Sequence, residues 1–194
     1  MTNHKVAVLV GSLRKDSLNQ KLAVALQTLA PPPITLEIIN IGVLPIYNQD
    51  FDDAANPPRE ITVFRQAILK FDAVLFITPE YNRSVPAVLK NAVDVGSRPW
   101  GKNVWDGKPG AVVSMTVGST GAVGANHHLR QSLVAINVPC MPQPEAYINN
   151  AMDIFDAHGN FVREVDRDFF RNFMTAFAVW VNTNTAAKRA LIPA

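Results

Sequence analysis

The sequence has a single cysteine, Cys140, among 194 residues. An intramolecular disulfide needs two cysteines, so a disulfide framework is excluded, and this cysteine usage is typical of a reducing compartment. Cys140 stands among apolar residues in Val138-Pro-Cys-Met141, which favours a buried structural thiol over a reactive nucleophile. We therefore expect a cytoplasmic protein.

Long apolar runs and clusters of like charge are also absent. No apolar stretch approaches the roughly 20 residues of a transmembrane helix, so we expect no membrane span. The formal net charge is only +2 and no lysine- or arginine-rich run occurs, which argues against a nucleic-acid partner. The first apolar run begins at Val6, so we expect no secretory signal peptide.

The overall composition and length are typical of a globular α/β protein. Hydrophobic residues make up 48% of the chain and charged residues 18%, a balance that excludes an intrinsically disordered protein. The length suits one domain, which we expect at residues 1–185, followed by a loose tail at residues 186–194.

Five apolar segments are predicted to be strands, and helical patterns separate them. The strands are expected at residues 6–10, 34–39, 72–78, 110–115 and 145–148. Apolar residues at helical spacing predict a helix after each of the first four strands, and a last helix over about residues 166–182. This alternation predicts a flavodoxin-like three-layer α/β sandwich, with a five-stranded parallel sheet in the order 2-1-3-4-5.

The first predicted strand turns sharply at Gly11 and Ser12 into a helical pattern. A helix that starts just after a strand offers free N–H groups and the positive end of its dipole to an anion. Ser17 and Asn19 add neutral donors, and Arg14 adds a planar guanidinium that suits phosphate oxygens. These residues predict a phosphate-binding turn.

A plain helix cap is the alternative explanation for Ser12 or Asp16, since such residues commonly cap helices. The turn lacks the Gly-Lys-Ser/Thr of a Walker A loop, and its one glycine, Gly11, excludes the three-glycine dinucleotide fingerprint. The number of donors within a few residues favours a monophosphate site over a cap alone.

The predicted strand order makes strands one and three neighbours, and ligands bind beyond the carboxyl ends of the strands at that point. The loops after strands three and four, residues 79–82 and 114–118, therefore face the same rim as the phosphate-binding turn. Their backbone groups suit the polar edge of a planar ring, and Gly118 and Gly121 would let the backbone approach closely. The sequence thus predicts a phosphorylated planar ligand.

Two motifs carry a family resemblance. They are Gly11-Ser-Leu-Arg-x-x-Ser-x-Asn19 and Pro79-Glu-Tyr-Asn-x-Ser-x-Pro-x-x-Leu-Lys-Asn-Ala-x-Asp94, and Asn126-His-His-Leu-Arg-Gln131 supports them. With the strand pattern, they resemble the NADPH-dependent FMN reductase family over nearly the whole chain. Within that family the sequence is most similar to the flavin-dependent quinone, chromate and azo reductases of bacteria.

The resemblance implies bound FMN and ping-pong hydride transfer from NADPH or NADH, through flavin N5, to a small-molecule acceptor such as a quinone, an azo compound, chromate or free flavin. It implies no catalytic side chain, because the flavin carries the chemistry. Arg83 stands where some relatives have an aromatic residue, and Arg83 and Arg98 are candidates for contacting the nicotinamide nucleotide at its 2′-phosphate. The residues implied to bind FMN are Ser12, Leu13, Arg14, Ser17, Asn19, Pro79, Glu80, Tyr81, Asn82, Ser114, Met115, Thr116 and Gly118.

A second class of function stays open, namely an electron carrier of the flavodoxin type. Carriers usually attract their protein partners with a strongly charged surface, and a net charge of +2 argues for an enzyme instead. Catalytic oxidation of NADPH in the presence of a quinone would discriminate the two.

Metal sites are less favoured. His127 and His128 are adjacent and point about 100° apart on a helix, so we expect them on its surface. Asp50, Asp52 and Asp53 are compatible with a cation site, but a solvated loop is favoured.

The apolar residues of the connection at residues 40–56 follow neither the helical nor the strand period. The length of this connection indicates that it covers a site or contacts a partner. We expect a homodimer or a homotetramer whose interface borders the flavin, because apolar surface beside a site often marks a subunit contact. The alternative is that the connection packs on its own domain. Its apolar residues are Leu44, Ile46, Tyr47 and Phe51.

Overall fold

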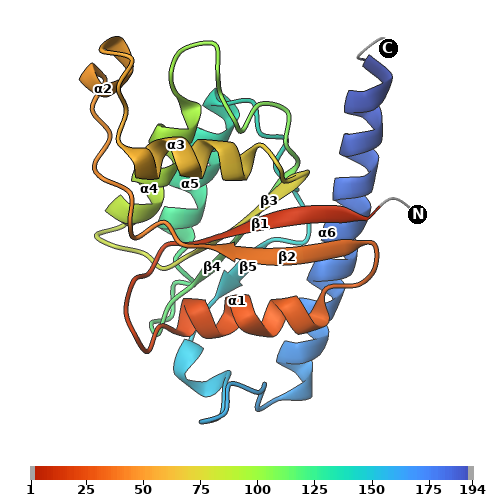
Figure 1. The fold of residues 1–194 in the computed structure, drawn as a ribbon. Helices are drawn as coiled ribbons and strands as arrows, with labels where there is room; N and C mark the ends of the chain where they lie inside the picture. Colours follow the sequence, from red (N-terminus) through yellow and green to blue (C-terminus); the bar gives the residue numbers. More distant parts are fainter. Residues whose placement is uncertain (1–2, 192–194) are drawn as a thin grey trace.

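The computed structural model describes the backbone of residues 3–191 and the side chains of residues 3–185. Its strands form one parallel sheet in the order β2-β1-β3-β4-β5, as predicted (Figure 1). The strands are β1 (His4–Val10), β2 (Ile34–Ile39), β3 (Ala73–Thr78), β4 (Gly110–Met115) and β5 (Ala146–Ile148).

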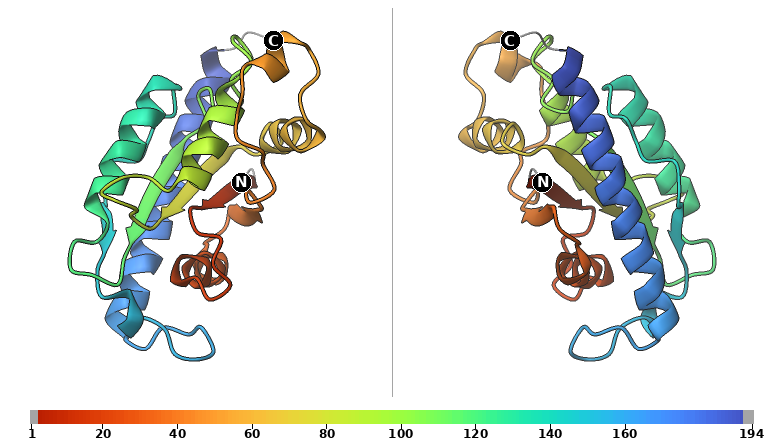
Figure 2. Two further views of the ribbon diagram at one scale, coloured as in Figure 1. Left: turned by 90° about the vertical axis from the view of Figure 1, so that its left-hand side faces the viewer. Right: turned by 90° about the vertical axis from the view of Figure 1, so that its right-hand side faces the viewer.

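Helices cover both faces of the sheet (Figure 2). One face packs against α1 (Leu18–Leu29) and α6 (Glu164–Leu191). The other packs against α3 (Arg59–Ile68), α4 (Ala87–Ser97) and α5 (Val123–Ala135). The flavodoxin-like three-layer sandwich is therefore confirmed.

The strands are buried on both sides, which explains their nearly continuous apolar sequences. All residues of β3 and β4 are buried. Side chains alternate between the faces, so Val6 and Val8 join the core under α1 and α6. Ala7 and Leu9 join the core under α3, α4 and α5.

Trp105 fills the second of these cores. Its indole is fully buried against Phe64, with ring centroids 6.0 Å apart, and its Nε1–H donates to the Val93 carbonyl at 3.0 Å. A Cβ at Gly96 would lie 2.4 Å from Trp105 Nε1, so α4 passes this close to the indole only because residue 96 is glycine. Trp100, in contrast, is 87% exposed.

The last helix is longer than predicted. It continues to Leu191 instead of ending near Asn182, so residues 186–191 of the expected loose tail are helical in their backbone. These six residues are alanine, lysine, arginine and leucine, which are good helix formers even without an apolar stripe. The remaining part of the expected tail, residues 192–194, lies outside the described residues. None of the helices within residues 3–191 is long and apolar enough to cross a membrane.

The connection at residues 40–56 contains a short helix, α2 (Asp50–Asp53), and is fixed by a buried ion pair. Arg65 donates to both carboxylate oxygens of Asp52 at 2.7 and 2.9 Å, and its Nε–H donates to the Val95 carbonyl at 2.8 Å. The Arg65 and Asp52 side chains are 11% and 6% exposed. The expectation that Asp52 is solvated is therefore wrong, because an arginine of the next helix reaches it.

Asn91 of α4 holds the same connection at a second place. Its Oδ1 accepts the Tyr47 N–H at 2.8 Å, and its Nδ2–H donates to the Pro45 carbonyl at 2.9 Å. Ile46 is 74% exposed. The other apolar side chains singled out in the sequence pack fully or partly on their own domain, and they are Leu44, Tyr47 and Phe51.

We predict that Asp52→Ala destabilises the fold by about 3–5 kcal/mol at neutral pH, because Arg65 would keep a buried charge without its partner. The Arg65 hydrogen bonds hold the pKa of Asp52 below its usual value. The pair therefore stabilises the folded state above the unfolded carboxyl pKa, and this contribution is lost as the pH falls through the lower, folded pKa. Urea unfolding at neutral and at acidic pH measures both effects.

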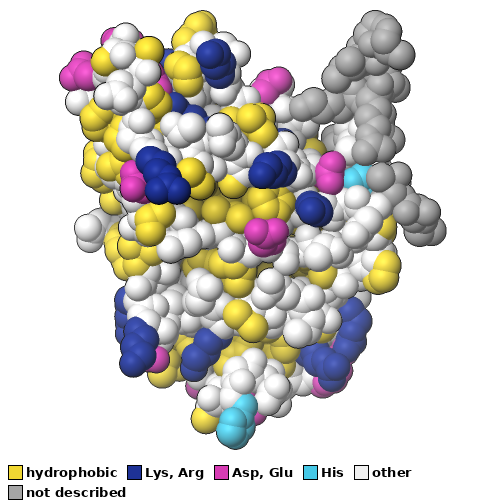
Figure 3. Space-filling model, in the orientation of Figure 1, with side chains coloured by type: hydrophobic (Ala, Val, Ile, Leu, Met, Phe, Trp, Pro, Cys, Tyr) yellow, Lys and Arg dark blue, Asp and Glu magenta, His cyan; other side chains and the backbone are white. Residues whose placement is uncertain are grey.

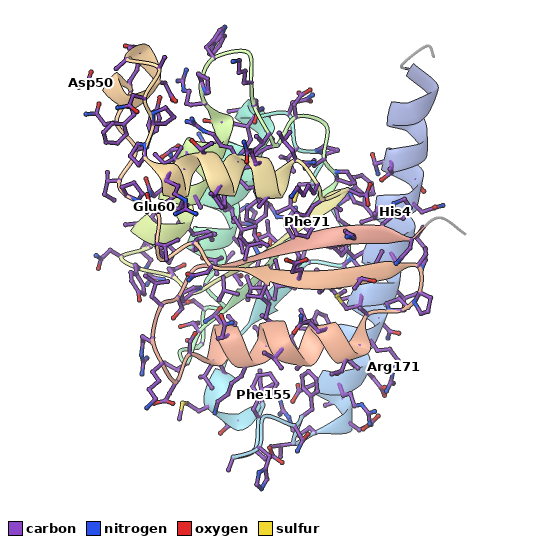
Figure 4. The ribbon with its side chains drawn as sticks, in the orientation of Figure 1. His4, Asp50, Glu60, Phe71, Phe155 and Arg171 are labelled. Atoms are coloured by element: carbon purple, nitrogen blue, oxygen red, sulfur yellow. The ribbon has the colours of Figure 1, made fainter. Side chains whose placement is uncertain are left out.

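Asp50→Ala is the matched control, since Asp50 is exposed and lies on the connection away from the sheet (Figure 4). Its stability should stay within about 0.5 kcal/mol of the unchanged protein. Equal losses in the two variants, or a loss for Asp52→Ala that grows on acidification, would contradict the role given to the ion pair.

Candidate functional site

The loops after β1, β3 and β4 meet at the carboxyl edge of the sheet and enclose a cavity of about 210 Å³. This is where the strand order changes direction, between β1 and β3, as the sequence predicts. The lining residues are Ser12, Arg14, Ser17, Leu18, Asn19, Pro79, Tyr81, Met115, Thr116, Val117 and Ala151.

Ser17 begins the helix at the cavity. Its Oγ accepts the backbone N–H of Gln20 at 3.2 Å, so Ser17, and neither Ser12 nor Asp16, is the N-cap of α1. The cap uses an acceptor lone pair, which leaves the hydroxyl hydrogen of Ser17 to be donated to a ligand. The first turn of α1 also presents backbone N–H groups without a helical partner, and they favour an anion.

The polar side chains of this turn are buried. Ser12, Ser17 and Asn19 are 8%, 4% and 6% exposed, and the buried Oδ1 of Asn19 has no hydrogen-bond partner. Leaving a buried polar atom unsatisfied costs about 1–3 kcal/mol, so the arrangement favours a ligand that supplies a donor. Arg14 is exposed and forms no ion pair with the described residues, which leaves its guanidinium available for an anion.

The loop after β3 forms a tight hairpin. Tyr81 and Ser84 exchange two backbone hydrogen bonds of 3.0 Å, and the two residues between them, Asn82 and Arg83, have φ angles of 50° and 64°. Such angles suit a two-residue hairpin turn, but they are strained for arginine. The turn displays the Arg83 side chain, which is 75% exposed.

Glu80 ties this hairpin to the next helix. Its side chain is 10% exposed, and its Oε2 accepts the backbone N–H of Ala125, in the first turn of α5, at 3.1 Å. Its Oε1 lies 3.4 Å from Arg83 Nη1. The carboxylate thus positions the loop and does not line the cavity.

Ser114, near the end of β4, has a similar role for the loop that follows this strand. It is fully buried, its Oγ–H donates to the Gly121 carbonyl at 2.7 Å, and its Oγ accepts Asn126 Nδ2–H at 3.1 Å. A Cβ at Gly121 would lie 2.7 Å from the Tyr147 carbonyl carbon, so this glycine permits close contact with β5. The expectation that Gly121 brings the backbone close to a ligand therefore needs correction. A Cβ at Gly118 would meet no atom within 4 Å.

The structure brings together eight of the residues implied to bind the cofactor, namely Ser12, Arg14, Ser17, Asn19, Pro79, Tyr81, Met115 and Thr116. Five others surround the cavity without lining it, namely Leu13, Glu80, Asn82, Ser114 and Gly118. Sequence reasoning missed Leu18 and Ala151 as lining residues, and it included Val117 only as part of the loop at residues 114–118. Ala151 belongs to the short 3-10 helix η1 (Ala151–Asp153), and only its place after β5, the neighbour of β4, could have indicated it.

Arg98 is not at this rim. Arg98 follows the last residue of α4, whereas the loop after β3 leads into the first residue of that helix. The 11 residues of α4 span about 16 Å, and this length separates Arg98 from the loop. Its guanidinium lies 5.5 Å from the centroid of the Trp100 ring.

The remaining candidates have structural partners. His127 and His128 are exposed on α5 as expected. His127 contacts Tyr147, and His128 contacts Ser84. Burial, followed by the hydrogen bond to Glu145, raises the pKa of Tyr147 to about 12. No group of three or more histidine, cysteine, aspartate or glutamate side chains that could hold a metal ion occurs within residues 3–185. Partial burial also raises the pKa of the Cys140 thiol, although Cys140 is half-buried and not fully buried as expected.

The sequence motifs of the cavity belong to a described family. The model of the NADPH-dependent FMN reductases matches residues 4–153, which include both motifs and all the lining residues. The chain belongs to this family.

Relatives in the FMN reductase family are similar along nearly their whole length. A quinone reductase of Pseudomonas putida is 53% identical over 183 residues, which cover 94% of this chain and 97% of that protein. A 2-hydroxy-1,4-benzoquinone reductase of a Burkholderia species is 47% identical over 177 residues, or 91% and 96% of the two chains. The structure of FerB, a flavoenzyme NAD(P)H:(acceptor) oxidoreductase from Paracoccus denitrificans, aligns with a TM-score of 0.87 and 42% identity over 93% of this chain and 98% of that one.

The cavity of this FMN reductase family member fits the cofactor in the family name. The α1 amino terminus, Arg14 and the hydroxyl of Ser17 suit a phosphate, and the unpaired Oδ1 of Asn19 suits a hydroxyl group of a sugar-like chain. Pro79 and Tyr81 offer apolar surface for a ring. The names of the three relatives all describe reductases or oxidoreductases, so an electron carrier is not favoured.

Proposed function

We propose that this oxidoreductase binds FMN in the cavity at the carboxyl edge of the sheet and reduces quinones with NAD(P)H. The observation that carries the proposal is the set of buried polar groups at the start of α1, with the unpaired Asn19 Oδ1 among them. The three relatives described above support a quinone or a similar small molecule as the acceptor. Azo compounds, chromate and free flavin are further acceptors to test.

The residues of the chain would bind and position the cofactor and the substrates. Arg14, Ser17 and the first turn of α1 hold the phosphate, while Pro79 and Tyr81 contact the ring. FMN, when bound, would supply the hydride acceptor and donor, and no side chain is assigned as a general acid or base. Arg83 extends from the hairpin into solvent, where it can contact the nicotinamide nucleotide or the acceptor.

We expect Arg14→Ala to weaken FMN binding by about ten- to a hundredfold, because a charge-assisted hydrogen bond contributes about 1.5–3 kcal/mol. Titration of the apoprotein with FMN, followed by flavin fluorescence, measures the dissociation constant. Arg59→Ala is the control, since Arg59 is an exposed arginine at the start of α3 and does not line the cavity. Equal affinities of the two variants would show that the phosphate lies elsewhere.

A single rim for both substrates predicts ping-pong kinetics, because NAD(P)+ must leave before the acceptor takes its place. Steady-state rates at several NADPH and quinone concentrations should give parallel double-reciprocal lines. Intersecting lines would mean that both substrates bind at once, and the single-rim model would then fail.

We also propose that the protein works as a homodimer or a homotetramer whose interface includes the exposed apolar side chains beside the cavity. Leu13 and Ile46 are 59% and 74% exposed, and Val43 is 57% exposed. A Cβ at Gly42 would lie 2.9 Å from the Leu13 side chain, so Leu13 and the connection at residues 40–56 are neighbours. Apolar side chains that gather beside a site favour a subunit contact.

We expect sedimentation at micromolar protein to show no major species near the 21.2 kDa monomer. Ile46→Glu should shift the protein toward monomer, whereas Val134→Glu, at an equally exposed valine on α5, should not. A monomeric protein with full turnover would refute the subunit contact.

A further inference from the structure

A second hollow, of about 720 Å³, lies along α1 beside the cofactor cavity. We call it the α1 groove. Ser17 lines both the groove and the cofactor cavity, so the two are adjacent. Its volume falls within the range of about 300–1,000 Å³ typical of small-molecule sites. One wall is the outer surface of α1, and the other is formed by residues 157–161 with the start of α6.

The charged side chains of the groove favour an anion. Lys15, Lys21 and Arg167 line it, and Glu164 is the one acidic residue in the lining. Glu164 pairs with Arg167 at 3.5 Å, but Lys15 and Lys21 form no ion pair with the described residues. Lys21 is also half-buried, and a partly desolvated ammonium without a counter-charge is stabilised by an anionic ligand. In Figure 3, lysine and arginine side chains lie to the left and to the right in the lower part of the molecule, with acidic side chains beside some of them.

The wall opposite α1 is fixed in place. Asp156 Oδ1 accepts the backbone N–H groups of His158 and Asn160 at 2.8 and 2.9 Å. The Phe161 ring packs against Phe155, with centroids 5.0 Å apart, and Phe155 lies below α1 in Figure 4. Phe161 is half-buried and lines the groove, so an aromatic surface suited to a planar base adjoins the cationic side chains.

We propose that the α1 groove binds the phosphorylated adenosine end of NADPH, with Lys15 and Lys21 beside its 2′-phosphate; this inference rests on the proposed function. A phosphate in the cofactor cavity and the phosphates of an incoming dinucleotide repel each other within the Debye length of about 8 Å. Cations adjacent to the cavity offset that repulsion. The groove provides them, whereas Arg98 lies at the far end of α4 and Arg83 extends from the hairpin tip.

The test compares NADPH with NADH, since they differ only in the 2′-phosphate. Lys21→Gln should raise KM for NADPH by about tenfold at unchanged kcat, and leave KM for NADH within about twofold. Lys15→Gln should act in the same direction, and because Lys15 is exposed on a loop it keeps the test valid if Lys21→Gln does not fold. Lys90→Gln, at an exposed lysine of α4, should change neither KM. Arg83→Gln should affect both nucleotides alike.

A binding measurement makes the test independent of turnover. Calorimetric titration of the FMN-loaded protein with adenosine 2′,5′-bisphosphate should show binding that weakens about tenfold in Lys21→Gln. AMP and inorganic phosphate, tested in parallel, should bind more weakly than the bisphosphate.

Equal losses for NADPH and NADH, or a bisphosphate affinity that Lys21→Gln and Lys15→Gln leave unchanged, would overturn the assignment. Inorganic phosphate that binds as tightly as the bisphosphate would also overturn it, because the groove would then hold a simple anion. If the unchanged protein oxidises neither NADPH nor NADH, the proposed function fails. The bisphosphate titration still tests whether the α1 groove binds the phosphorylated adenosine end of a nucleotide.

Discussion

The pairing of β1 with β3 is the constraint on which the site depends. The ladder between them ends where the Gly11 N–H, one residue after β1, donates to the carbonyl of Ile77, one residue before the end of β3, at 2.8 Å. A Cβ at Gly11 would lie 3.2–3.3 Å from side-chain atoms of Thr78, Pro79 and Leu89, so these neighbours would have to shift by a few tenths of an ångström to admit it. This close approach gives one cavity two walls that are far apart in the sequence.

Around the cavity, hydrogen bonds to distant partners hold the loops in place. Glu80 links the loop after β3 to the backbone of Ala125, and Ser114 links β4 to Gly121 and Asn126. These side chains are also buried, which shields the hydrogen bonds that hold the walls from water. A preformed site lowers the ordering cost of binding, which suits an enzyme that must release one substrate and admit another on every cycle.

The parts of the fold that the sequence predicts are those encoded locally. Continuous apolar runs identify β1, β3 and β4, and the donors between Ser12 and Asn19 identify the turn that lines the cavity. The parts it missed depend on long-range contacts. Nothing near Asp52 indicates that Arg65 neutralises it, and nothing near Ser114 indicates that it bonds to the next helix instead of facing the ligand.

Anaerobic stopped-flow absorption tests the central claim, that this cavity holds a flavin that accepts a hydride from NADPH and passes it to a quinone. The FMN-loaded protein is mixed first with NADPH and then with quinone while the flavin absorbance is recorded. The account predicts complete bleaching by NADPH, followed by full recovery with quinone, each at least as fast as steady-state turnover. A protein that retains no FMN after reconstitution, or a bleached flavin that quinone does not reoxidise, would contradict it.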